Sequence, residues 1–175
     1  VRARFEGMPS TYGHVIVDEA QDLSLLQLRA VQRRSSGLSL VGDDAQRSNP
    51  NGIGLRAAAR HLEVEAAEMA TAYRMSAEIA EWLNDHARRH HIDAVRLVGI
   101  RPTGRRVHEP GPGADVHALV HELGSRWATV AVIDATDTWS HKGVEYDAVV
   151  VDTAGMHPAQ VYLAASRAAH ELVVV

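Results

Sequence analysis

Two adjacent carboxylates, Asp18 and Glu19, directly follow a short apolar run at residues 15–17. A continuous β-branched run of this kind predicts a buried strand of a parallel sheet, and open α/β sheets bind ligands just beyond the carboxyl ends of their strands. At such a place Asp18 could hold Mg²⁺ through water, and Glu19 could orient or deprotonate an attacking water molecule. The alternative is a strand that leads into the first turn of a helix, a position that Asp and Glu also favour.

Four more polar segments follow the first one along the chain. Together the five segments are residues 17–22 (VDEAQD), 41–46 (VGDDAQ), 73–74 (YR), 141–147 (HKGVEYD) and 161–168 (VYLAASRA). Each one alone is a weak signal, because a lone Gly-Asp pair usually marks a turn and a lone arginine usually lies on the surface. Their joint order is a much more specific signal.

In this order, the five segments resemble motifs II to VI of superfamily 1 helicases of the UvrD/Rep type. The resemblance covers most of the chain and implies an α/β fold, with a RecA-like parallel sheet flanked by helices. It implies that residues 1–72 form the C-terminal portion of a first RecA-like domain, with motifs II and III. Residues 73–175 would then form the second RecA-like domain, with motifs IV, V and VI.

The resemblance also implies a site for ATP and Mg²⁺. By this resemblance Asp18 binds the metal, Glu19 is the catalytic base and Gln46 senses the γ-phosphate. Arg74 and Arg167 would reach the phosphates from the second domain, Arg167 as an arginine finger. These residue types suit the chemistry, because γ-phosphate hydrolysis needs a metal, a positioned water and positive charge, and the arginine fork grips two phosphate oxygens.

Three further residues take roles from the same resemblance. Glu145, with Gly143 nearby, would lie at the nucleotide ribose, and Gln21 would link motif II to its neighbours. His141 is expected to be a loop histidine rather than a metal ligand, because the eleven histidines show no spacing typical of a metal site.

The sequence departs from the family pattern in several places. The phosphate-binding loop GxxxxGK[ST] is absent, and no such loop precedes Lys142, the only lysine. The chain therefore resembles the C-terminal part of a longer protein, and we expect that by itself it neither hydrolyses ATP nor binds it tightly. Residues 47–56 contain no aromatic side chain that could stack on a base. No large insertion separates motifs IV and V.

Composition narrows the classes of protein that remain. A net charge of −4 gives no general attraction to nucleic acid, so binding would need a local basic patch such as Arg88-Arg89 or residues 101–106. With no cysteine, disulfides and thiolate metal sites are excluded, which suits a cytoplasmic protein. No apolar run approaches the length of a membrane span, so no membrane partner is expected.

The expected function is part of an ATP-dependent DNA helicase or translocase motor, with single-stranded DNA as the expected nucleic acid. One alternative is a related ATPase that remodels RNA polymerase, and another is a non-catalytic binding module that retains the fold.

The elements that must position the site alternate along the chain, which favours α/β layers. Strands are predicted at residues 15–17, 38–41, 63–70, 129–133, 146–151 and 172–175, and helices at 24–34, 55–62, 76–90, 116–123 and 158–169, with loops at 1–13, 101–115 and 134–145.

Overall fold

The computed structural model describes residues 12–111 and 113–175, and it confirms the predicted mixed α/β fold with parallel sheets flanked by helices. The described chain divides into two compact units, and the boundary between them lies between Ala67 and Glu68. Most of the predicted loop at residues 1–13 lies outside the described residues. The assignment of residues 1–72 and 73–175 to first and second RecA-like domains stays a prediction.

The first unit contains two parallel strands and two helices. In chain order its elements are β1 (Val15–Val17), the 3-10 turn η1 (Ala20–Asp22), α1 (Leu25–Gln32), β2 (Leu38–Leu40), the 3-10 turn η2 (Asp44–Gln46) and α2 (Leu55–Leu62). β1 pairs with β2 in parallel, and an isolated bridge from Tyr12 to Ser35 extends the pairing. Helix α1 begins where the sequence favours it, because Ser24 and Gln27 form a reciprocal capping box.

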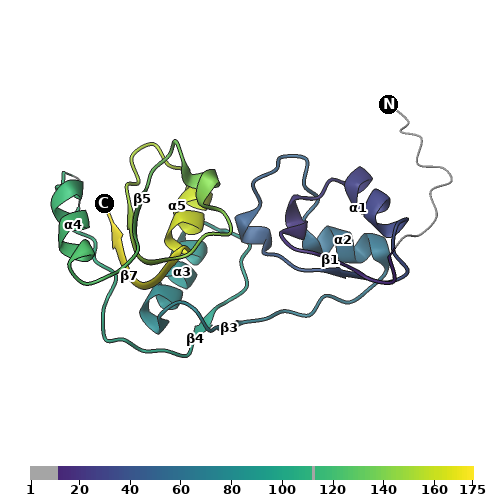
Figure 1. Ribbon diagram of the computed structural model, residues 1–175, viewed down its shortest axis with the longest axis horizontal. Helices are drawn as coiled ribbons and strands as arrows, with labels where there is room; N and C mark the ends of the chain where they lie inside the picture. The colour runs from purple at the N-terminus through teal and green to yellow at the C-terminus, as the bar shows by residue number, and fades with distance from the viewer. Residues whose placement is uncertain (1–11, 112) are drawn as a thin grey trace. The chain divides into compact units, whose positions relative to one another are not determined.

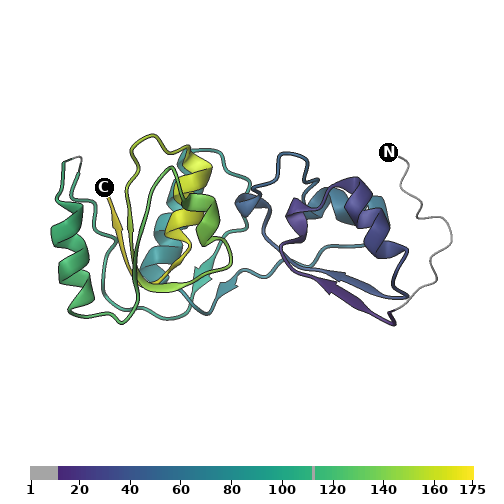
Figure 2. The ribbon, with the colours of Figure 1, turned by 45° about the horizontal axis from the view of Figure 1, so that its top comes forward.

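The predicted burial of β1 on both faces is wrong. Figure 2 shows α1 and α2 on the same side of the β1–β2 pair, so one face of these strands carries no helix. Accordingly, the side chain of Ile16 is 72% exposed, while Val15 and Val17 on the opposite face are partly buried. Side chains alternate between the two faces of a strand, so only the face that meets the helices is covered.

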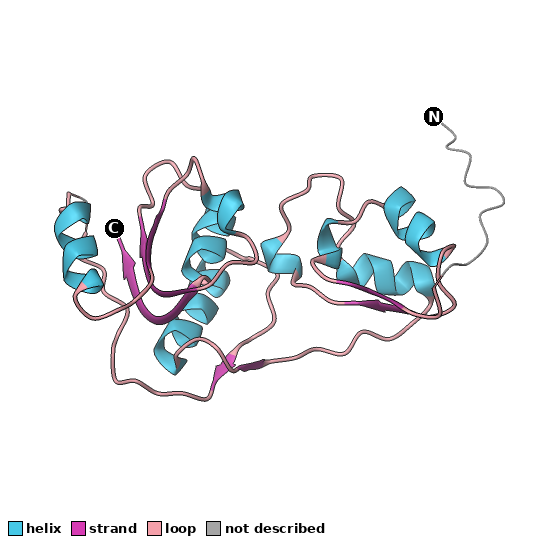
Figure 3. Ribbon diagram, in the orientation of Figure 1, coloured by secondary structure: helices cyan, strands magenta, loops and turns pink. Residues whose placement is uncertain are grey.

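The second unit is built on a three-stranded parallel sheet. Its elements are β3 (Thr71–Ala72), α3 (Ala77–Arg89), β4 (Val98–Gly99), α4 (Val116–Gly124), β5 (Val130–Ile133), the 3-10 turn η3 (Thr138–His141), β6 (Tyr146–Val151), α5 (Pro158–Ala165) and β7 (Ala168–Val174). The sheet order is β5-β6-β7, and β3 and β4 form a separate short parallel pair. Figure 1 shows α4 on one face of the sheet and α3 and α5 on the other, and Figure 3 shows the same sandwich by element type.

The core of the second unit explains why β6 was predicted correctly. Its residues 148–151 are fully buried, since the central strand is covered on both faces. On one face, Ala148, Val150, Val173 and Leu123 form a cluster with the apolar side of α4. A strand buried on both faces needs a continuous apolar run, which is the pattern that the sequence shows there.

Two other predicted elements differ from the structure. Residues 63–70 form no strand. Glu63 takes the left-handed conformation that often ends a helix (φ 56°), and the segment that follows is almost entirely exposed. The predicted helix at 158–169 ends at Ala165, and the last strand starts at Ala168 rather than at residue 172. The backbone turns at Ser166 and Arg167, so the final strand is longer than predicted.

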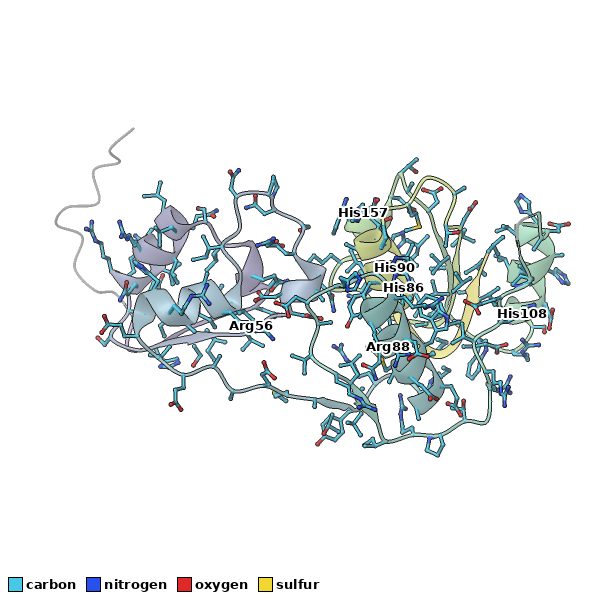
Figure 4. All side chains as sticks on the ribbon, turned by 180° about the vertical axis from the view of Figure 1, so that it is seen from behind. Arg56, His86, Arg88, His90, His108 and His157 are labelled. Carbon is cyan, nitrogen blue, oxygen red and sulfur yellow. The ribbon has the colours of Figure 1, made fainter. Side chains whose placement is uncertain are left out.

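Helices α3 and α5 are joined by a buried histidine. His86 lies on α3 and its Nε2 donates a hydrogen bond to the carbonyl of Pro158 at the start of α5 (2.9 Å). Its ring stacks on Trp82 and contacts His90, one turn away on each side, as Figure 4 lets the reader follow for His86 and His90. Burial lowers the pKa of His86 and therefore favours its neutral ring.

Glu78 in the first turn of α3 gives a prediction for acid stability. Partial burial raises the pKa of this carboxyl, but hydrogen bonds from its own backbone, Thr103 and Gly104 outweigh that effect and lower it from 4.5 to about 2. A carboxyl with a lowered folded-state pKa stabilises the protein above its unfolded-state pKa and loses that contribution as the pH falls towards 2. We expect Glu78→Gln to be less stable than wild type at pH 6 and the difference to shrink steadily below pH 4.5.

Thermal unfolding of the two proteins between pH 6 and pH 2 measures this difference. Glu81→Gln, on an exposed position of the same helix, is the matched control and should follow wild type. A Glu78→Gln difference that stays constant down to pH 2 would contradict the assignment.

Candidate functional site

The candidate site residues of the first unit lie at the carboxyl ends of β1 and β2. Asp18 follows β1, and its Oδ1 accepts a hydrogen bond from the backbone N–H of Glu19 (2.8 Å). Glu19 has a left-handed backbone (φ 53°) and precedes the turn η1. Such a conformation costs about 1–3 kcal/mol for a residue with a side chain and persists where surrounding contacts enforce it. Here it turns the chain sharply, so both carboxylates stay at the end of the strand.

A buried amide connects the two strand ends. Gln21 is fully buried; its Nε2 donates to Glu19 Oε2 (2.7 Å) and its Oε1 accepts from the backbone N–H of Asp43 (3.2 Å). Asp43 in turn accepts hydrogen bonds from the backbone of Ala45 and from the Gln46 side chain, each 2.9 Å long. The structure thus brings Glu19, Gln21 and Gln46 into one hydrogen-bonded chain that runs through Asp43.

The neighbouring acidic residues have structural roles. The Asp22 carboxylate accepts hydrogen bonds from Ser48 and from the backbone of Asn49, each 2.8 Å long. Asp44 accepts from the backbone N–H of Leu55 (2.5 Å) at the start of α2. Sequence reasoning missed both roles and that of Asp43, although an Asp before a short turn is a common backbone acceptor. These bonds fix the loop at residues 47–54 against the strand ends.

Gly42 lets Gln21 occupy its position. A Cβ atom at Gly42 would collide with Gln21 Oε1 and would also lie 3.1 Å from the backbone nitrogen of Ala20. We expect Gly42→Ala to destabilise the protein by about 1–3 kcal/mol, as overpacking of a filled site typically does. Urea denaturation of the chain measures this loss.

Gly13→Ala is the matched control for this prediction. Gly13 is in the same unit, and an added Cβ there meets no atom within 4 Å. The control should stay within about 0.5 kcal/mol of wild type, the usual range of surface substitutions. Equal stability of the two variants would show that Gln21 is not held against Gly42.

Two of the candidate residues of the second unit lie on an open cleft of about 310 Å³, and Gly143 and Arg167 are not among its lining residues. Arg74 and Glu145 line it and form an ion pair of 3.1 Å, with the Arg74 side chain 81% exposed. The remaining lining residues are Tyr73, Arg101, Thr129, Tyr146, Asp147, Ala169 and His170. Sequence reasoning singled out Arg74 and Glu145 but gave no separate role to Tyr73, whose exposed ring adds an aromatic surface to the cleft.

The charges on this cleft are mixed. Arg74, Arg101 and His170 contribute the basic groups, and Glu145 and Asp147 contribute the carboxylates. Hydrogen bonds from the backbone and hydroxyl of Thr129 lower the pKa of Asp147, and nearby His170 lowers it further. Asp147 therefore stays ionised, and its carboxylate is occupied in holding the start of β5 to the start of β6. Glu145 is therefore the cleft carboxylate that, together with Arg74, could contact a ligand.

Arg167 lies in the turn between α5 and β7, and its side chain is largely buried. The guanidinium donates to Ser166 Oγ (2.9 Å) and to the carbonyl of Val144 (3.4 Å), in the loop that also carries Gly143 and Glu145. The whole residue is 9% exposed. In this conformation Arg167 supports the Glu145 loop, so contact with a phosphate would require the guanidinium to turn outward.

Among the described residues, no group of three or more His, Cys, Asp or Glu side chains is arranged to hold a metal ion. Within the same described part of the chain, no helix is long and apolar enough to cross a membrane.

No protein-family model matches this chain, and a search of curated protein sequences finds no match. Solved structures of similar fold are the helicase nonstructural protein 10 of an arterivirus in complex with DNA (TM-score 0.63, 18% identity) and the helicase of PRRSV (TM-score 0.59, 16% identity). A second structure of the arterivirus helicase has a TM-score of 0.59 and 16% identity.

These matches cover 93%, 91% and 93% of this chain but only 39%, 34% and 38% of the helicase chains. The chain therefore spans less than two fifths of the length of these viral proteins. At 16–18% identity the likeness concerns the fold alone. The chain has a helicase-like α/β fold.

Proposed function

We propose that this chain is part of an ATP-dependent helicase or translocase motor of the UvrD/Rep type, which couples ATP hydrolysis to movement on nucleic acid. The observation that carries the proposal is the hydrogen-bonded chain from Glu19 through Gln21 and Asp43 to Gln46. It joins the ends of two parallel strands, the place where open α/β sheets bind ligands. A carboxylate beside the proposed Mg²⁺ ligand Asp18 is thereby held in one orientation.

The proposed roles in the first unit follow from side-chain chemistry. Asp18 would hold Mg²⁺, which would neutralise charge on the ATP phosphates when bound. Glu19 would take a proton from the attacking water, since its Oε2 is fixed by Gln21. Gln46 would sense the γ-phosphate, because its amide can move between Asp43 and a phosphate oxygen.

The proposed roles in the second unit centre on the cleft. Tyr73 offers a ring face on which a base can stack, Glu145 and Gly143 would lie at the ribose, and Arg74 would turn from Glu145 to a phosphate. An exposed ion pair is worth only about 0–1 kcal/mol, so ligand binding can open it. We propose Arg167 as the arginine finger, which would leave its contacts with Ser166 and Val144.

Single-stranded DNA is the proposed track, supported by a viral helicase of similar fold that was solved in complex with DNA. A related ATPase that acts on RNA polymerase is a second candidate, because residues 47–56 contain no aromatic side chain for base stacking. A non-catalytic module that retains the fold is a third. We place the protein in the cytoplasm, since a chain without cysteine fits a reducing compartment.

Nucleotide binding by the cleft can be tested on this chain directly. The chain has no GxxxxGK[ST] loop, whose backbone N–H groups and lysine usually meet the β- and γ-phosphates. We therefore expect Mg·ATP to bind with a dissociation constant of roughly 1 mM, about 4 kcal/mol of binding free energy. In an NMR titration, resonances of Tyr73, Arg74 and Glu145 should shift together and saturate in this range.

Arg74→Ala should weaken these shifts, whereas Arg106→Ala, at an exposed arginine outside the cleft, should leave them unchanged. Micromolar affinity would show that the site is more complete than its residues suggest. Shifts that avoid the cleft altogether would refute a nucleotide site there.

A further inference from the structure

The loop that carries Glu145 has little support of its own. Gly143, Val144 and Glu145 are exposed, and Gly143 takes a left-handed backbone (φ 78°) that a side chain would strain. A short exposed loop with such a glycine samples many conformations unless contacts at its ends restrict it. Glu145 nevertheless has a defined position in the cleft, beside Arg74.

A side-chain contact closes the base of this loop. His141, the residue before Lys142, places Nδ1 2.8 Å from the hydroxyl of Tyr146, the residue after Glu145. The two rings also meet edge to face, with centroids 5.7 Å apart. The backbone N–H of Val144 donates to the His141 carbonyl (3.1 Å), so the loop is tied across its base by both side chain and backbone.

A carboxylate fixes the orientation of the histidine ring. Asp137 Oδ2 lies 3.0 Å from His141 Nε2, and Asp137 Oδ1 accepts a hydrogen bond from the backbone of Asp134. A carboxylate can only accept here, so Nε2 of the neutral ring carries the proton and Nδ1 accepts from the Tyr146 hydroxyl. The side chain of His141 is 16% exposed, and both ring nitrogens are therefore used inside the protein.

We propose that His141 is a positioning residue that, held between Asp137 and Tyr146, keeps the 142–145 loop in the conformation that presents Glu145 to a nucleotide. The inference rests on the proposed nucleotide site, because it gives Glu145 its ligand. Tyr146 lines the same cleft. Its hydroxyl contacts His141, and this contact restricts the orientation of the tyrosine ring. Arg167 holds the loop from the other side through the Val144 carbonyl.

The first test measures the contact between His141 and Tyr146 directly and does not require nucleotide. Nitrogen NMR of the chain should show neutral His141 as the Nε2–H tautomer. The Tyr146→Phe substitution should shift the Nδ1 resonance of His141. In His141→Ala the backbone N–H groups of Val144 and Tyr146 should exchange with solvent faster. His117→Ala, on an exposed position of α4, is the matched control. An Nδ1–H tautomer, or unchanged exchange in His141→Ala, would overturn the proposal.

The second test measures the effect of the His141→Ala substitution on the KM for ATP and on kcat in the full-length gene product. Loss of one positioning hydrogen bond should raise the KM for ATP roughly three- to tenfold, with a smaller change in kcat, because the ribose contact acts in binding. His141→Asn, which keeps a polar atom near the place of Nδ1, should recover part of the affinity. Equal loss in both variants, with lower melting temperatures, would indicate a purely structural role and would overturn the proposal.

The outcomes also separate this inference from the nucleotide site on which it rests. A loop that loosens in His141→Ala while the KM stays unchanged would overturn the positioning role alone. If the chemical shift of Glu145 in the wild-type protein does not change when Mg·ATP is added, the proposed nucleotide site is refuted, and the role assigned to the loop is refuted with it.

Discussion

Replacing Glu19 by Gln is expected to reduce ATP hydrolysis by the full-length gene product about 10²- to 10⁴-fold while leaving ATP binding intact. This is the range that a positioned general base typically contributes. The amide keeps the shape of the side chain and one acceptor oxygen, so the hydrogen bond from Gln21 Nε2 can persist. The variant therefore removes the proton acceptor and little else.

Steady-state hydrolysis together with nucleotide affinity measures this prediction. The matched control is Glu65→Gln, an exposed glutamate in the same unit, which should match wild type. A Glu19→Gln rate within twofold of wild type would exclude Glu19 as the base. Loss of ATP affinity along with turnover would instead assign it to binding.

Replacing Arg167 by Ala is expected to lower turnover by about 10³-fold or more, the usual effect of removing an arginine finger. The structure adds a second consequence, because the buried guanidinium also donates to Ser166 and to the Val144 carbonyl. Its removal leaves these acceptors without that donor, so the variant should be less stable by about 1–3 kcal/mol.

Arg167→Lys separates the two effects. Lysine keeps the positive charge and a donor but lacks the planar fork that grips phosphate oxygens in two places. We expect the lysine variant to recover most of the stability and little of the turnover. Recovery of turnover to within a few-fold of wild type would show that Arg167 acts through charge and packing alone.

The sequence predicts elements best where packing on both sides of the chain is complete. The strand at residues 146–151 is predicted correctly because helices cover its residues 148–151 on both faces, and such burial requires apolar side chains. The shorter run at 15–17 is also apolar, yet Ile16 is exposed, because an apolar run does not show whether a second layer covers the strand. The predicted start of the first helix at residue 24 lies one residue before the observed start of α1 at Leu25.

The site was predictable only as a set of residue types. Order along the chain singled out Glu19, Gln46, Arg74 and Glu145, and their proposed roles stay predictions. The hydrogen bond from the Asp43 backbone to Gln21 joins residues that are 22 positions apart in sequence, and no local sequence pattern predicts it. The burial of Arg167 likewise depends on where α5 ends and β7 begins, and the largely apolar sequence on both sides of it does not show that boundary.

The central claim is that the chain belongs to a motor driven by ATP on nucleic acid. Its most direct test is the ATP hydrolysis rate of the full-length gene product with and without single-stranded DNA, using Glu19→Gln as the blank. We predict hydrolysis that single-stranded DNA stimulates and that Glu19→Gln reduces about 10²- to 10⁴-fold. Hydrolysis that responds to RNA polymerase and not to DNA, or no hydrolysis above the Glu19→Gln blank under any condition, would contradict it.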